Sequence, residues 1–182
     1  MQPQSAVAAL TAGALAAVLL PAPAPAQNRN EVFIGSYALA VDYDRTFARD
    51  EFAGFHVGYS RDVTDHFGFR GSYYVLEHDD VAGLDATGLD LSLVGGLLGA
   101  GFNVFAGGGL YSEAWELAGG ASERFAGLQL LVGVGYNWQH VGLDVTFAGR
   151  GTSDYEDFVN SGSRSGIEAS AGTASLNVGY RF

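Results

Sequence analysis

The chain has 182 residues, a length that suggests a single domain. It has no cysteine, which excludes disulfide bonds, thiolate metal sites and a lipid anchor built on an N-terminal cysteine. Its formal net charge is −11, and all of its nine basic residues are arginines, so nucleic-acid binding, which needs a basic surface to neutralise phosphates, is excluded.

The first segment has the features of an export signal. Residues 6–20 are small and apolar except for Thr11, and an alternating Pro-Ala run follows and ends in Ala24-Pro25-Ala26. That ending matches the A-x-A pattern of a signal-peptidase site, so we predict a signal peptide over residues 1–26. The apolar run is shorter than the ~20 residues of a spanning helix, which disfavours a membrane anchor. Residues 1–5 lack the Lys or Arg usual in such signals.

After Gln27, apolar residues alternate with small or polar ones, and no segment has the pattern of an amphipathic helix. Glycine is abundant at 27 residues, while the hydrophobic content of 48% is too high for a disordered glycine-rich chain. About eight segments alternate, each near the ~9–11 residues with which a tilted strand crosses a bilayer. These segments are 33–43, 53–60, 67–75, 88–97, 102–111, 128–138, 141–148 and 173–182.

The two faces of these strands differ in composition. One face is rich in Leu, Val, Phe and Tyr, and the other in Gly, Ser and Ala with a few charges. A water-soluble sandwich would carry many charges on its polar face, whereas the narrow lumen of an eight-stranded barrel leaves little room for side chains. We therefore predict an all-β fold over residues 27–182, a closed antiparallel eight-stranded transmembrane β-barrel. In the first strand, the apolar positions from Phe33 to Tyr43 are expected to face lipid.

The connections between strands alternate in length. Residues 63–66, 98–101 and 139–140 form short turns, whereas 44–50, 78–85, 116–124 and 151–166 are longer and more acidic. Short turns at one end and long loops at the other are typical of outer-membrane barrels, with both termini on the periplasmic side. Aromatic residues at the strand ends predict two interfacial belts. The first comprises Phe33, Tyr59, Phe67, Phe102, Tyr136, Trp138, Tyr180 and Phe182, and the second Tyr43, Phe52, Tyr73, Trp115, Phe125 and Phe147.

The end of the chain carries a family resemblance. Residues 176–182 resemble the terminal strand of outer-membrane barrels, with Val178, Tyr180 and Phe182 at alternate positions. With the strand count, the chain resembles the small eight-stranded barrels of the OmpA transmembrane-domain and OmpX type. The resemblance implies a place in the cell outer membrane, contact with its lipid and lipopolysaccharide, and recognition of the last strand by the barrel-assembly machinery. A monomer is expected, and no activity is specified.

Several charged or titratable residues fall on the predicted lumen face: Asp42, His56, Arg70, Asp90, Glu113, Asp144 and Arg150. Charges in a narrow lumen must pair or meet water. We expect Arg70 to pair with Asp144, and Arg150 with Glu113 or Asp90. Such a network would plug the barrel and leave a structural or surface-interaction role. The alternative is a narrow porin-like channel for ions or small solutes.

A lipid-modifying enzyme is the third possibility, and catalytic residues are not predicted. The outer-membrane lipid A deacylases carry a His-x-Ser pair, but His56, His66, His78 and His140 are followed two positions later by Gly or Asp. His78, at the start of an acidic loop, is the best-placed base. No cofactor or metal site is expected, because the loop carboxylates lack EF-hand-like spacing. The long loops are also candidates to present Trp115, Tyr155 and Phe158 to a surface ligand.

Overall fold

The computed structural model describes residues 29–44, 49–116, 120–161 and 166–182, so the predicted signal peptide lies outside the described residues. Eight strands and one helix follow along the chain. They are β1 (Asn30–Tyr43), β2 (Asp50–Asp62), β3 (Phe67–His78), β4 (Asp85–Leu97), β5 (Gly101–Glu116), β6 (Ser122–Asn137), β7 (Val141–Arg150), α1 (Ser153–Asn160) and β8 (Ala169–Arg181).

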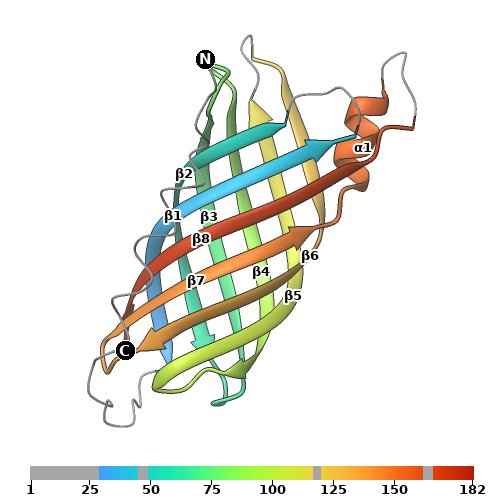
Figure 1. Cartoon of the computed structure of the whole chain (residues 1–182). Helices are drawn as coiled ribbons and strands as arrows, with labels where there is room; N and C mark the ends of the chain where they lie inside the picture. Colours follow the sequence, from blue (N-terminus) through green and yellow to red (C-terminus); the bar gives the residue numbers. More distant parts are fainter. Residues whose placement is uncertain (1–28, 45–48, 117–119, 162–165) are drawn as a thin grey trace, which may run out of the picture.

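Each strand pairs antiparallel with the next, and β8 pairs with β1, so the sheet closes into the predicted eight-stranded barrel (Figure 1). At the closing seam the amides of Asn30 and Phe182 each donate to the other's carbonyl oxygen, at 3.1 and 2.8 Å. We call the end of the barrel that holds the Asn30–Phe182 pair and the three short turns the turn end. The opposite end, with the longer connections and α1, is the loop end.

Side chains alternate between an apolar outer surface and a filled interior. Phe55, Leu128 and Leu130 point outward and are at least 70% exposed, as expected for positions that face lipid. The interior accommodates large rings because glycines oppose them: Phe33 lies over Gly58 and Phe105 over Gly133, where any added side chain would collide with the ring. The narrow lumen is therefore packed with side chains. Among the described residues, no helix has the length and apolarity to cross a membrane.

The orientation predicted for the first strand is wrong. Phe33, Tyr37, Leu39 and Val41 are buried inside the barrel, while Ile34 on the alternate face is 61% exposed. The loop half of the interior is an apolar and aromatic core, so in β1 the face richer in large apolar residues belongs inside. Shifting the assignment of a strand by one residue moves every side chain to the opposite face of the sheet.

The aromatic belts also differ from the prediction. At the turn end, Tyr59, Phe67, Phe102, Tyr180 and Phe182 are exposed on the outer surface, but Phe33 is buried in the lumen. At the loop end, Phe52, Trp115 and Phe125 point inward and are almost fully buried. Tyr73 and Phe147 remain on the outside there. The loop-end aromatics mainly build a core, which alternation alone does not distinguish from a belt.

The helix α1 was not predicted from the sequence. It occupies eight residues of the longest connection and lies at the loop end of the barrel (Figure 1). Its first turn contains Asp154 and Glu156, which suit the positive end of the helix dipole. Tyr155 is its buried residue. A helix of two turns with one buried side chain gives too short a pattern for periodicity to reveal.

The reversed face of β1 has a simple test, because the chain contains no cysteine of its own. We expect Cys at position 42 (Asp42→Cys) to react with a water-soluble maleimide at least about tenfold faster than Cys at position 41 (Val41→Cys), because the latter is reached only through local opening. Asp42 is exposed and Val41 is fully buried. Mass spectrometry of the folded protein in lipid vesicles measures both rates, and equal rates would contradict this orientation.

Candidate functional site in the barrel interior

Arg150, near the loop end of β7, is the centre of the largest polar network inside the barrel. Its side chain has no exposed surface. One terminal nitrogen donates to Glu113 Oε2 at 2.6 Å, and the other donates to Asp90 Oδ1 at 2.9 Å. The guanidinium also lies over the Tyr111 ring, 4.5 Å from its centroid. One cation inside the barrel thus meets two carboxylates and an aromatic face, an arrangement that compensates for lost hydration.

Glu113 on β5 is as fully buried as its partner and accepts several hydrogen bonds. Oε2 accepts from the Tyr74 hydroxyl at 2.7 Å, while Oε1 accepts from Trp115 Nε1 at 2.9 Å and from the Tyr155 hydroxyl at 2.6 Å. Every oxygen of this buried carboxylate therefore has charged or polar donors, as a charge in low dielectric requires.

The network is sealed from the loop end by aromatic side chains. Tyr155 is fully buried and stacks on Phe125, with ring centroids 4.7 Å apart, and Trp115 packs 4.8 Å from the same ring. Burial, together with the nearby Glu113 charge, raises the pKa of Tyr155 well above its usual range. Its hydroxyl therefore stays protonated and donates to Glu113. Tyr155 fixes the helix α1 to the barrel mouth together with Asp154, which accepts from the Ala126 amide at 2.9 Å, and Phe158, which packs against Phe125.

A second network lies nearer the turn end. Arg70 on β3 reaches across the lumen to Asp144 on β7, with Nη2 at 3.0 and 3.1 Å from the two carboxylate oxygens. Asp144 also accepts from Asn177 Nδ2 at 2.7 Å. The Asn177 amide oxygen in turn contacts Nε2 of His56. The Arg70 guanidinium stacks 4.2 Å from the centroid of Phe33, so this pair also combines charge with ring packing.

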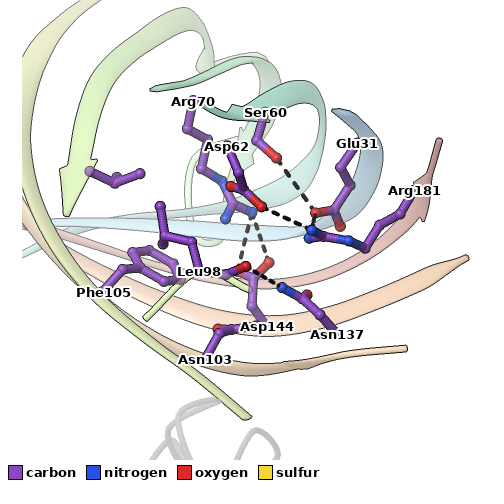
Figure 2. Close-up of a pocket in the computed structure, with 11 residues that line it drawn as sticks. Glu31, Ser60, Asp62, Arg70, Leu98, Asn103, Phe105, Asn137, Asp144 and Arg181 are labelled. Atoms are coloured by element: carbon purple, nitrogen blue, oxygen red, sulfur yellow. Dashed lines mark hydrogen bonds and ion pairs between the residues drawn. The ribbon is translucent and has the colours of Figure 1, made fainter. Parts of the chain in front are cut away.

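A third ion-pair group, which the sequence analysis missed, lies beside the seam of the barrel (Figure 2). Arg181 on β8 donates to Asp62 at 2.9 Å and to Glu31 at 3.3 Å. Glu31 and Asp62 stand at the very ends of their strands, outside the segments whose alternation is clear. The signal that would have found them is the same alternation extended by two residues beyond each apolar run.

The structure brings together all but one of the predicted lumen residues. His56, Arg70 and Asp144 meet in the second network, and Asp90, Glu113 and Arg150 in the first. Asp42 is a correction. It lies on the outer face at the loop end, 55% exposed, and pairs with Arg49 at 3.4 Å, because the faces of β1 are reversed.

In the described part of the barrel, two small cavities lie between the networks. One is lined by Glu31, Asp62, Arg70, Asp144 and Arg181 among others, and the second by His56, Arg70, Asp90 and several Ser and Thr hydroxyl groups. Each has room for only a few water molecules. Arg70 borders both, so the Arg70–Asp144 pair stands between them. Within the described ranges, no group of three or more His or acidic side chains is placed to hold a metal ion.

The histidines occupy structural positions. His78 Nδ1 accepts from the backbone amides of Asp80 and Val81, both at 3.0 Å, and its Nε2 lies 3.3 Å from Asp50 Oδ1. Because the lone pair of Nδ1 is engaged, the ring proton sits on Nε2 and points at Asp50. His66 contacts the Gly96 carbonyl oxygen in a turn at 3.0 Å. His78 therefore organises the start of its loop and has no free nitrogen for a substrate.

The buried network predicts a large stability effect from one side chain. Arg150→Met leaves Glu113 and Asp90 without their cation, so we expect the free energy of unfolding to fall by about 3–5 kcal/mol. The exposed pair of Arg49 provides the matched control, and Arg49→Met is expected to cost less than about 1 kcal/mol. Urea unfolding in lipid vesicles measures both. Equal losses of stability in the two variants would contradict the claim that the buried Arg150 network stabilises the barrel.

No protein-family model and no curated protein matches this sequence. Solved structures do match. The barrel is similar to the crystal structure of Ail, the attachment invasion locus protein of Yersinia pestis, in complex with the heparin analogue sucrose octasulfate. The TM-score is 0.56 and the sequence identity is 17%, over 85% of this chain and 99% of that chain.

A second similar structure is that of Neisserial surface protein A. Its TM-score is 0.60, with 14% sequence identity over 83% of this chain and 97% of that one. Identities this low establish a shared fold and carry over no ligand. The chain therefore has the fold of the small eight-stranded outer-membrane β-barrels.

Proposed function

We propose that this protein is a small outer-membrane barrel with a structural or surface-interaction role, whose lumen is closed by arginine–carboxylate pairs. The observation that carries this proposal is the Arg150 network. A fully buried cation bound to two carboxylates, under an aromatic core, fills the loop half of the barrel where a pore would have to pass. The apolar outer surface supports insertion in lipid.

The asymmetry of the two ends supports an orientation. In this proposal the turn end faces the periplasm, and the loop end faces outward among the lipopolysaccharide headgroups. Val178, Tyr180 and Phe182 point outward along the last strand and are at least half exposed. They are accessible there to the barrel-assembly machinery, and we retain them as its recognition signal. The closed sheet leaves no free edge for strand pairing between copies, which supports a monomer.

Any surface ligand would meet a negative loop end. The acidic residues of the described loop-end connections and adjoining strand ends include Asp79, Asp80, Asp85, Glu116, Glu123, Asp154 and Asp157. Ail was solved with a polyanion, a heparin analogue. Because like charges repel, we propose that this chain does not share that ligand class and that its loops favour cationic partners. The predicted display of Trp115 and Tyr155 is wrong, since both are buried.

The surroundings of His78 and His56 favour structural roles over catalysis. General-base catalysis needs a nitrogen lone pair within reach of a nucleophile. His78, the best candidate, uses Nδ1 to accept two backbone amides and directs Nε2 at Asp50. His56 lies deep in the lumen, 5% exposed. A lipid-modifying activity is therefore not proposed.

The closed lumen predicts an electrically silent protein. We expect the folded mature chain, inserted in a planar bilayer, to give no steady single-channel conductance, because ions cannot pass the Arg150 network and its aromatic cover. Protease resistance of the same sample establishes folding and insertion. Reproducible openings in the wild type, altered in Arg70→Ala or Arg150→Ala but unaltered in the rim variant Glu123→Gln, would establish the alternative, a narrow channel.

A further inference from the structure

The connection between β3 and β4 is organised around a histidine nitrogen that has to stay unprotonated. His78 is the last residue of β3, and its side chain is only 4% exposed. Its Nδ1 accepts from the backbone amides of Asp80 and Val81, both at 3.0 Å. These bonds use the lone pair of Nδ1, which a protonated imidazole no longer has. A proton on Nδ1 would therefore set three N–H groups against one another.

The other groups around the ring belong to the neighbouring strands. On β2, Asp50 Oδ1 lies 3.3 Å from Nε2, and Phe52 packs edge-on against the ring, with centroids 4.8 Å apart. From β1, the Tyr43 hydroxyl donates to the second oxygen of Asp50 at 3.0 Å. The Nε2–Asp50 contact suits the neutral and the charged ring alike, because Nε2 carries a proton in both. Only the bonds to Nδ1 therefore distinguish the two charge states.

The two ends of this loop are held by bonds that do not involve the imidazole. The Asp79 amide donates to the carbonyl oxygen of Glu51 on β2 at 2.9 Å, and the His78 amide donates to that of Leu84 at 3.0 Å. Within the loop, the Leu84 amide reaches the Val81 carbonyl oxygen at a longer 3.3 Å. Loss of the bonds to Nδ1 would thus free the loop tip, residues 80–83, while both ends stay attached to the barrel.

We propose that His78 is a proton-sensitive latch for this loop: protonation of its ring in mild acid releases the loop tip and leaves the barrel intact. Imidazole is the side chain that changes its charge near neutral pH. The released loop carries one proton more at His78 than the latched loop, so acid favours release. The charged ring keeps its contact with Asp50, and the exposed carboxylates of Asp79 and Asp80 follow it directly in the chain. The latch is independent of the ligand that the loop end meets.

Nuclear magnetic resonance of the mature chain in phosphatidylcholine nanodiscs tests the latch between about pH 8 and about pH 5, the range in which imidazole titrates. The nitrogen chemical shifts of the His78 ring report the protonation of Nδ1 directly. We expect the amide signals of Asp80 and Val81 to move with the same midpoint as the ring. Their solvent exchange, corrected for its intrinsic pH dependence, is expected to rise at least about tenfold, whereas the Asp79 amide keeps its protection.

Two variants locate the effect. His78→Asn removes the titrating group but keeps an acceptor, because an Asn side-chain oxygen can accept a backbone amide two residues further on. It is expected to hold the tip at both pH values, whereas the control His66→Asn, in a turn at the other end of the barrel, is expected to keep the full response.

Three results would overturn the proposal. In the wild type, they are a His78 ring that titrates while the Asp80 and Val81 amides stay unchanged, and a ring that is still neutral at about pH 5. The third is the full response in His78→Asn, which would assign the pH dependence to the loop carboxylates. The joint titration of ring and amides in the wild type decides the matter even if the Asn variant fails to fold.

Discussion

A buried guanidinium group is the constraint on which the loop half of this barrel depends. Arg150 has no exposed surface, so the cost of removing it from water has to be met by Glu113, Asp90 and the tyrosine ring beneath it. Each carboxylate then needs its own donors, and the hydroxyl groups of Tyr37, Tyr74 and Tyr155 supply them. The aromatic core at the loop end thus donates hydrogen bonds to the buried carboxylates as well as filling the lumen.

Barrel geometry explains why this network is possible. An eight-stranded barrel has an interior about as wide as the side chains that fill it, so residues on opposite walls touch. Arg70 on β3 reaches Asp144 on β7 in this way. Rings as large as Phe33 and Phe105 fit because glycines face them. Part of the abundance of glycine in the sequence is therefore a packing requirement of a narrow lumen.

Both ends of the interior place one arginine between two carboxylates. In the first network, the carboxylates of Glu113 and Asp90 and the hydroxyls around them enclose the Arg150 terminal nitrogens. At the seam, one arginine serves two carboxylates and leaves an oxygen of Glu31 without a partner in the described chain. The first arrangement suits a permanent plug.

Strand number, closure and most of the lumen residues could be predicted from alternation, because successive side chains of a barrel strand point in turn to the lipid and to the lumen. The pairs Arg70–Asp144 and Arg150–Glu113 followed from the scarcity of inward charges. The prediction failed where composition is ambiguous. The large apolar residues of β1 fit lipid or core equally, which misplaced Asp42, and Trp115 and Phe125 fit a belt or a core. Glu31 and Asp62 were missed because they lie at the ends of their strands, outside the segments whose alternation is clear.

Hydrogen–deuterium exchange of the wild type and Arg150→Met, in lipid vesicles and under conditions where both stay folded, tests the central claim most directly. If Arg150 holds the loop half closed, the variant will exchange faster in α1 and in the loop-end halves of β5 and β7, while the turn-end halves keep their protection. Unchanged exchange, or a uniform increase along all strands, would contradict the claim that this one cation organises the loop half of the barrel.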